Sequence, residues 1–436
     1  MNHEHDETKQ HSFFMDTILF VIGMSFLSIN TVIPYFLNTL GASTLEISMA
    51  SILVSIGTFI SQPYFARKIV GLTYKLKAFI KILSIQRIFF FIFVLTIPLT
   101  VRIHYRLTII LFLICWGIFN FFVGSYSPFF MSLFSKMVPD DQKGRLLGFS
   151  NAVGNLIALG AAGLISILLN RLPFPYNFAC IFGLGVFCLL LDCLDFCFMK
   201  ESPDESTGQP MGTWEYFRNI PRILRFHPRY ASLVAGYSLL TVSNVSLVYY
   251  SLFAIRHYNA QASEIALFTG IGVTINVIGN ILYGILADRY SHRLVLQISS
   301  FCGALAAVIV AAVPSLLSVF AAFTLSNLCS AGYILSTNIL IMHNSPRESL
   351  PVFVSTNVMV TLMISSIFTM ISSFLVDHFS FILVFIITGG AALGAFLILS
   401  LIYKRVPLSL SDNGERTFAR NEPKNPRRKI SGTLIE

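Results

Sequence analysis

The sequence predicts an all-α membrane protein of twelve transmembrane helices in two pseudo-symmetric six-helix bundles. The prediction rests on composition, on twelve long apolar runs, and on matching motifs in the two halves. Of the 436 residues, 55% are hydrophobic and only 12% are charged, and the mean hydropathy is +0.73. A soluble domain carries roughly 25% charged residues. This chain has too few charges to cover a water-facing surface, so lipid must surround most of it.

The apolar runs are long enough to cross a bilayer, which takes about 20 apolar residues in a helix. They are continuous rather than alternating, which favours helices over the strands of a membrane barrel. The predicted spans are 13–38, 45–66, 78–99, 107–134, 146–170, 178–199, 230–255, 263–287, 294–313, 316–343, 351–376 and 380–403.

Basic residues predict the orientation of these spans. With the N-terminus inside, 24 of the 30 Lys and Arg residues fall in the tails and inner connections, and two lie within the third span. The outer loops hold four, namely Arg102, Arg106, Arg171 and Arg256. The positive-inside rule therefore predicts a multi-pass cell-membrane protein with both termini cytoplasmic. The net charge of +9 does not indicate nucleic-acid binding, because the basic residues lie between apolar runs rather than on one polar face.

The span positions divide the chain into five segments. The expected segments are an N-terminal tail (1–12), an N-terminal bundle (13–199), a central linker (200–229), a C-terminal bundle (230–403) and a basic tail (404–436). Within the linker, residues 214–226 mix apolar and basic positions, as an amphipathic helix at a membrane surface does.

Four pairs of corresponding positions indicate that the bundles are internal repeats. The second and eighth spans open with Glu46 and Glu264, and each glutamate precedes an amide, Gln62 or Asn280, by sixteen residues. The first and seventh spans each carry an asparagine five residues before a tyrosine, at Asn30 and Tyr35 and at Asn244 and Tyr249. Alternating-access carriers are commonly built from such repeats.

The stretch from Gly284 to Arg293 reads GILADRYSHR. It resembles the loop signature of the major facilitator superfamily, G-x-L-A-D-R-x-G-R-[RK], with departures at Ser291 and His292. Twelve spans, a six-plus-six split and a long central loop are similar to the same family's plan. The resemblance implies a secondary carrier whose gate includes Gly284, Asp288, Arg289 and Arg293.

In this interpretation Asp288 accepts hydrogen bonds from exposed amides at the start of the fifth span, near residues 144–147, where the helix dipole favours a negative charge. The alternative is a solvated turn with ordinary inner-side basic residues. The corresponding N-terminal position is Val70, so the N-terminal half lacks an equivalent carboxylate.

Among the charged residues inside predicted spans, where a charge is costly and is a functional candidate by default, four are singled out, since Lys81 can extend to the inner surface. They are Asp16, Arg87, Asp192 and Asp195. Arg87 lies about 14 Å into the third span, at 1.5 Å per residue. The carboxylates can carry a proton coupled to transport; an internal ion-pair network that only holds helices together explains them equally well. Metal binding by Cys193 and Cys197 with these aspartates is disfavoured, because cysteine is a common small apolar residue in such helices.

The family resemblance implies a central cavity lined by the first, fourth, seventh and tenth spans. The polar residues in those spans are uncharged, which favours a neutral or amphipathic solute; hydrogen bonding between helices is the alternative role for each. The predicted cavity residues are Asn30, Tyr35, Asn120, Tyr126, Asn244, Tyr249, Asn327 and Asn338.

The fifth span contains Gly148, Gly154, Gly160 and Gly163. This pattern is similar to the glycine-rich signature of proton-driven drug exporters but lacks its Gly-Pro pair, and close helix packing also explains it.

We expect a monomeric exporter of a small organic solute, with protons as the coupling ion. The alternatives are an importer of a neutral nutrient and a transporter-like receptor that does not transport. No catalytic, cofactor or nucleotide-binding motif is found, so we expect neither an enzyme nor a cofactor.

Overall fold

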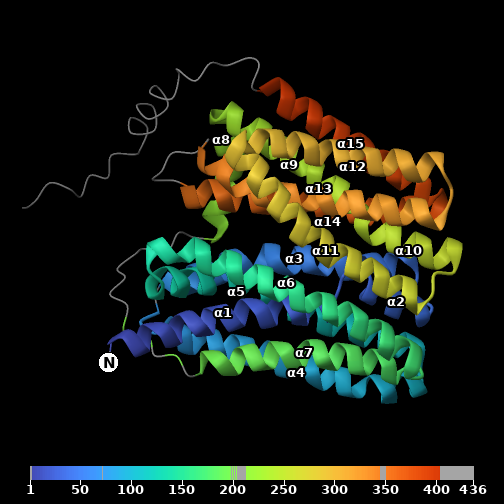
Figure 1. Ribbon diagram of the computed structural model, residues 1–436, viewed down its shortest axis with the longest axis horizontal. Coiled ribbons are helices and arrows are strands. Elements are labelled where there is room, and N and C mark those ends of the chain that lie inside the picture. Colours follow the sequence, from blue (N-terminus) through green and yellow to red (C-terminus); the bar gives the residue numbers. More distant parts are fainter. Residues whose placement is uncertain are drawn as a thin grey trace, which may run out of the picture.

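The computed structural model describes residues 2–70, 72–197, 199, 201, 203, 213–343 and 350–402, and its helices lie side by side in two groups (Figure 1). The first group holds α1 (Asn2–Phe26), α2 (Val32–Thr39), α3 (Thr44–Val70), α4 (Lys75–Ile103), α5 (Tyr105–Met137), α6 (Asp140–Arg171) and α7 (Tyr176–Phe196). The second holds α9 (Pro228–Asn244), α10 (Ser246–Tyr258), α11 (Ala262–Arg289), α12 (His292–Ala312), α13 (Leu316–His343), α14 (Leu350–His378) and α15 (Phe381–Ile402). Helix α8 (Thr213–Phe226) lies between the two groups in the sequence.

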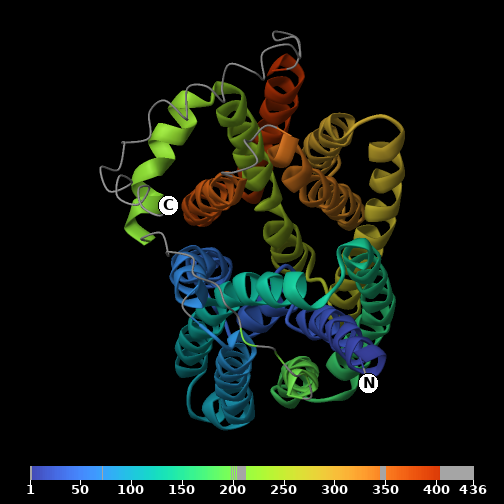
Figure 2. The same ribbon diagram turned by 90° about the vertical axis from the view of Figure 1, so that its left-hand side faces the viewer.

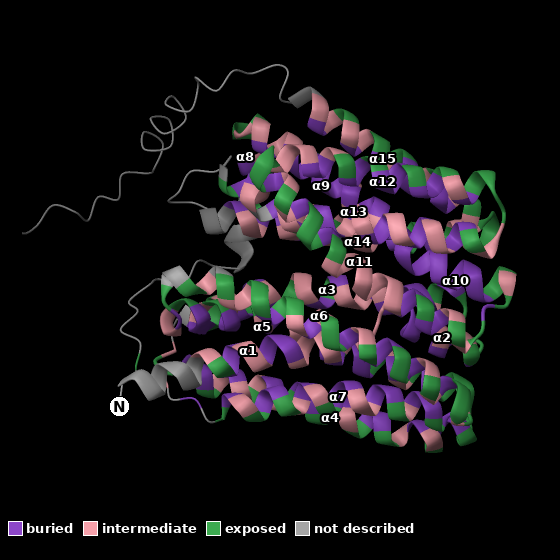
Figure 3. Ribbon diagram, in the orientation of Figure 1, coloured by how far each residue is buried: buried purple, intermediate pink, exposed green. Residues whose placement is uncertain are grey.

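The all-α membrane fold is confirmed. Among the described residues, eleven helical segments are long and apolar enough to cross a membrane, and the first predicted span is shared between α1 and α2. The perimeter is apolar: Ile88, Ile92, Leu95 and Leu99 form one stripe along α4 and are 51–64% exposed. Exposed positions recur along the outward faces of the helices (Figure 3). Lipid tails would cover such a surface in the membrane.

The first span was expected to be a continuous helix, and this is wrong; the seventh is continuous apart from a one-residue interruption. The first breaks between Phe26 and Val32, where the Ile33 amide donates to Ser28 O at 3.0 Å. The seventh is interrupted at Val245, which separates α9 from α10 but keeps helical backbone angles. Short polar side chains compete with the helical backbone here, since Ser246 Oγ donates to Ser243 O at 2.7 Å. Both breaks fall at the repeated asparagine–tyrosine motif, which supports the internal repeat.

The repeated glutamates have a structural role. Glu46 accepts a hydrogen bond from the Ser43 amide at 2.7 Å, and Glu264 accepts one from the Gln261 amide at 2.7 Å. Each carboxylate therefore caps the start of its own helix by reaching back three residues, which satisfies a main-chain donor that the helix leaves free.

Close helix packing explains only part of the glycine pattern in the fifth span. A methyl group at Gly154 would meet Ile18 Cα at 3.2 Å, so this glycine is needed where α6 crosses α1. At Gly148, Gly160 and Gly163, an added methyl group would have nothing within 4 Å. For these three glycines, the packing explanation is wrong in this conformation.

Candidate functional site

A buried polar cluster joins α1, α4, α5 and α7 near the middle of the first bundle. Arg87 Nη2 donates to Asp192 Oδ2 at 2.5 Å, and the two side chains are 2% and 0% exposed. The Tyr126 hydroxyl donates to Asp16 Oδ2. The buried carboxyl groups of Asp16 and Asp192 lie near enough to interact electrostatically with each other and with Arg87. Four residues from four helices thus form one connected network.

The sequence predicted three of these residues as intramembrane charges and Tyr126 as a cavity residue, and the fold brings all four together. The fourth charge, Asp195, is half-buried one turn from Asp192, and its Oδ2 atom is buried without a hydrogen-bond partner. Asp16 Oδ1, Asp192 Oδ1 and Arg87 Nη1 are likewise buried without partners. The cluster therefore has unused hydrogen-bonding capacity.

The helix breaks hold two of the predicted cavity residues. Asn30 lies in the first break, and its main-chain oxygen accepts from Ser251 Oγ of the second bundle at 2.5 Å. Asn244 ends α9 beside the second break, and its Oδ1 is buried without a partner. Tyr35 is half-buried on α2, with its ring centroid 5.8 Å from that of Phe178.

The other predicted asparagines bond mainly within their own helices. Asn120 Nδ2 donates to Trp116 O at 2.8 Å and Asn327 Nδ2 donates to Phe323 O at 2.8 Å, and both side chains are buried. The side chain of Asn338 lies outside the described part of the structure.

The two bundles meet at the end of the molecule opposite the N-terminus, where α2 and α10 lie, and diverge toward the other end (Figure 1). We call these the loop end and the terminal end. Thr31 Oγ1 lies 2.7 Å from Thr269 Oγ1, and Ser48 Oγ lies 2.8 Å from the Tyr249 hydroxyl. Tyr249 also donates to Thr369 O at 3.0 Å, so this predicted cavity residue lies in the contact between the bundles.

Arg256, at the end of α10, makes the most extensive of these contacts. Its guanidinium donates to Asn38 Oδ1 at 3.1 Å, to Thr44 Oγ1 at 2.6 Å and to Ala42 O at 2.9 Å. All three acceptors belong to the first bundle. The sequence analysis counted Arg256 only as an outer-loop charge; the scarcity of such charges was the signal that could have singled it out.

The predicted gate residues lie at the terminal end of α11 and the start of α12. Asp288 and Arg289 are exposed, Gly284 is half-buried, and Arg293 Nη2 donates to Ser400 O of α15 at 3.0 Å. Nearer the loop end, α11 packs antiparallel on α6, where a methyl group at Gly270 would lie 3.6 Å from Ala162 Cβ.

Comparison with known proteins decides the family. A family model described as the Major Facilitator Superfamily matches residues 15–255 and 231–433. The chain belongs to the Major Facilitator Superfamily. A superfamily member is a secondary transporter rather than an enzyme, so this multi-pass membrane protein carries a small-molecule substrate.

Solved structures share the superfamily fold at low sequence identity. A point mutant of the nucleoside transporter NupG aligns with a TM-score of 0.69 and 11% identity, covering 91% of this chain and 100% of that one. A bacterial homologue of the iron transporter ferroportin, in an inward-facing state, gives 0.68 and 15%, with 91% and 99% covered. A D-xylose-proton symporter gives 0.67 and 16%, with 92% and 98% covered. No curated protein matches this sequence.

Proposed function

We propose that this superfamily member exports a small organic solute across the cytoplasmic membrane in exchange for protons, as a monomer with both termini in the cytoplasm. With that orientation the terminal end is the cytoplasmic end. The contacts at the loop end then close the outer side, and the structure corresponds to an inward-facing state of an alternating-access cycle.

The observation that carries proton coupling is the charge count of the buried cluster. Two carboxyl groups, Asp16 and Asp192, share one guanidinium, that of Arg87. A net charge buried in a low-dielectric interior is costly, and the cluster is neutral only if one proton is bound. The cluster is therefore suited to bind and release a single proton as the conformation changes.

A gate at the terminal end is supported by the register of α6 and α11. The stretch of α11 from Gly270 to Asp288 is as long as the stretch of α6 from residue 144 to Ala162. Because the helices run antiparallel and Gly270 lies beside Ala162, Asp288 is level with the start of α6. If the terminal ends came together, the carboxylate could accept hydrogen bonds from the free amides of α6.

Two glycines are placed where α6 and α11 would touch if the terminal ends came together. The stretch of α11 from Gly270 to Gly284 is as long as the stretch of α6 from Gly148 to Ala162. Gly284 and Gly148 are therefore level with each other. Both have open space where a side chain would be. Small residues let helix backbones approach closely. We infer that α6 and α11 come into contact at these glycines in the outward-facing state.

Transport coupling can be tested in proteoliposomes that contain a trapped pH-sensitive dye. A panel of neutral and amphipathic compounds is added outside, and proton movement and compound accumulation are followed together. Proton and solute fluxes in opposite directions, lost in Asp16→Asn, support the proposal. Asp195→Asn is tested beside it, since this carboxylate has no hydrogen bond to the network but acts on Asp192 through space.

The alternatives give different results. Proton and solute fluxes in the same direction would indicate an importer of a neutral nutrient. Saturable binding without any accumulation would indicate a receptor that does not transport. Accumulation that is independent of the pH gradient would rule out proton coupling and leave the transporter assignment intact.

A further inference from the structure

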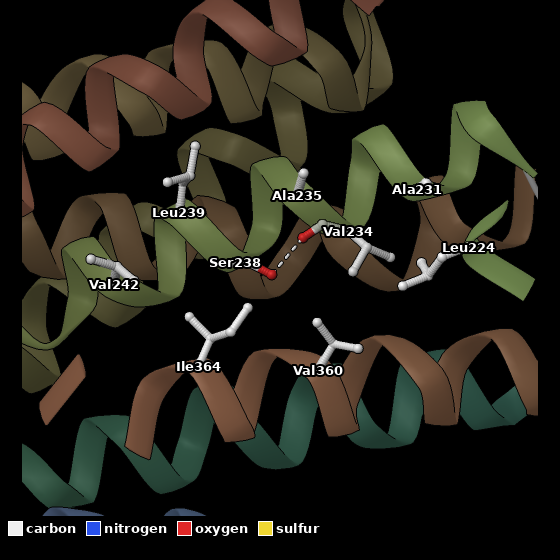
Figure 4. Close-up of a pocket in the computed structure, with 9 residues that line it drawn as sticks. All are labelled: Leu224, Ala231, Val234, Ala235, Ser238, Leu239, Val242, Val360 and Ile364. Carbon is white, nitrogen blue, oxygen red and sulfur yellow. Dashed lines mark hydrogen bonds between the residues drawn. The ribbon is translucent and has the colours of Figure 1, made fainter. Parts of the chain in front are cut away.

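A cavity of about 460 Å³ lies between α9 and α14, beside α8 (Figure 4). Its volume falls within the roughly 300–1,000 Å³ of small-molecule sites. Small side chains on α9, namely Ala231, Ala235 and Ser238, leave room for it, and Ser238 lies on the side of α9 nearer Val360 and Ile364 of α14. Leu224 of α8 forms part of one end, and the remaining lining residues are Val234, Leu239 and Val242.

The lining offers no free polar group. Ser238 is its only polar side chain, and Ser238 Oγ donates to Val234 O at 2.8 Å within α9. Water in such a space would lack the two to four polar partners that an ordered buried water needs. An apolar occupant is therefore favoured.

The cavity opens to the lipid side of the bundle. A neighbouring face of α9 is turned toward α13, because the Tyr237 hydroxyl donates to Thr337 O and Thr241 Oγ1 donates to the Tyr333 hydroxyl. Ala235, on the cavity side, is exposed. On α14, the lining residues Val360 and Ile364 adjoin the exposed perimeter row that contains Met363, Ile367 and Ile371.

The terminal end of this α9–α14 contact is closed. The Tyr230 hydroxyl donates to Phe353 O at 2.5 Å, and the His227 ring packs edge-on against the Phe353 ring at 5.0 Å. Burial lowers the pKa of His227, so its ring is neutral near pH 7. The lining runs along α9 from Ala231 to Val242, about 17 Å at 1.5 Å per residue. This is close to half of a hydrocarbon core of about 30 Å.

Helix α8 supplies positive charge beside the terminal end of the cavity. Viewed from the terminal end, α8 lies at the outer edge of the second bundle, beside α9 and α14 (Figure 2). Its apolar side carries Ile223, which is buried, and Leu224. Arg218, Arg222 and Arg225 are exposed on the other side. An amphipathic helix with this division lies at a membrane surface and attracts anionic headgroups.

We propose that the cavity between α9 and α14 binds one acyl chain of an anionic phospholipid whose phosphate is held by the arginines of α8. The occupant is a bilayer lipid because the cavity is apolar, opens to the perimeter and is about one leaflet long. The preference for an anionic headgroup follows from the three exposed arginines. The site is separate from the buried charge cluster, so it does not depend on the proposed proton coupling.

The test uses the full chain in nanodiscs that contain phosphatidylglycerol or phosphatidylcholine with a photoreactive group on one acyl chain. Cross-linked peptides are identified by mass spectrometry. Phosphatidylglycerol is expected to label α9 and α14, and Ala235→Phe, which fills the cavity, should reduce that labelling by about tenfold. Ala311→Phe, at an exposed position on α12, is the matched control and should leave it unchanged.

The headgroup is tested by Arg222→Gln/Arg225→Gln, which should lower the preference for phosphatidylglycerol over phosphatidylcholine on the order of tenfold. Arg67→Gln/Lys68→Gln, exposed at the terminal end of α3, is the control. If Ala235→Phe fails to fold, Ala231→Leu replaces it. Three results would each overturn the proposal. They are labelling that persists in Ala235→Phe, equal labelling by the two lipids, and cross-links between two copies of the chain through these peptides.

Discussion

Arg87 and Asp192 are buried among apolar side chains, with Asp16 and Tyr126 completing their network. The sequence predicted the charged members, because a charge inside an apolar run stands out. It could not predict the pairing. The packing of apolar side chains decides which helices become neighbours and how each helix is rotated about its axis. Many arrangements bury the same apolar residues equally well, so the sequence alone does not select one.

Removing one partner of the ion pair is expected to cost more than removing both. Arg87→Met should lower the free energy of unfolding by about 3–5 kcal/mol, because it leaves buried carboxyl groups uncompensated. The double variant Arg87→Met/Asp192→Leu should recover most of that loss, since apolar replacement of a buried pair is often neutral. Thermal unfolding in detergent measures both. A double variant no more stable than Arg87→Met would contradict a stabilising pairing of these two residues.

At the scale of elements, the predicted spans match the helices within a few residues, apart from the broken first span and the interrupted seventh. Those breaks could not be predicted from run length, since a long apolar run reads the same whether or not the helix is continuous. The serines, threonines and asparagines at the breaks were visible, but such residues also occur in unbroken helices, as Asn120 does in α5.

The crossing of α3 and α5 depends on Gly57. A methyl group there would lie 2.9 Å from the Asn120 carbonyl carbon and 2.9 Å from the Phe121 nitrogen, and these backbone atoms can move only if the helices separate. We expect Gly57→Ala to destabilise the protein by about 1–3 kcal/mol. Gly160→Ala, which meets open space, should be neutral or stabilising by up to about 1 kcal/mol. Equal thermal unfolding of the two variants would show that the α3–α5 crossing tolerates a side chain.

At the scale of the whole molecule, the contacts made by Arg256 hold the bundles together at the loop end. Charge-assisted hydrogen bonds contribute about 1.5–3 kcal/mol each when buried, and less when partly exposed as here. Arg256→Gln should therefore shift the population toward a state open at the loop end. Spin labels at Thr39→Cys and Ser263→Cys, with the native cysteines replaced, should report a longer distance. Arg171→Gln, which removes another loop-end arginine, should leave this distance unchanged. An unchanged distance in Arg256→Gln would show that the Arg256 contacts do not hold the loop end closed.

Opening of one end should accompany closing of the other. The pair Gly148→Cys and Gly284→Cys is expected to form a disulfide when the terminal ends meet, and more readily when Arg256→Gln is added. A protease site is introduced between residues 204 and 212. After cleavage, the two halves run separately on a denaturing gel unless the disulfide joins them. Gly160→Cys with Gly284→Cys is the control, because Gly160 lies about 18 Å further along α6. Cross-linking that is insensitive to Arg256→Gln would argue against coupling of the two ends.

The paired breaks in the first and seventh spans also bear on how the membrane stays sealed. An unbroken helix transmits a tilt along its full length, whereas the non-helical stretch around Thr31 lets α2 tilt separately from α1, and Val245 is a point where α10 can bend relative to α9. Helices α2 and α10 can therefore stay in contact at the loop end while the rest of the two bundles approach each other at the terminal end. Such an occluded intermediate would leave ions no continuous aqueous path through the molecule, so the carrier could cycle without a leak across the membrane.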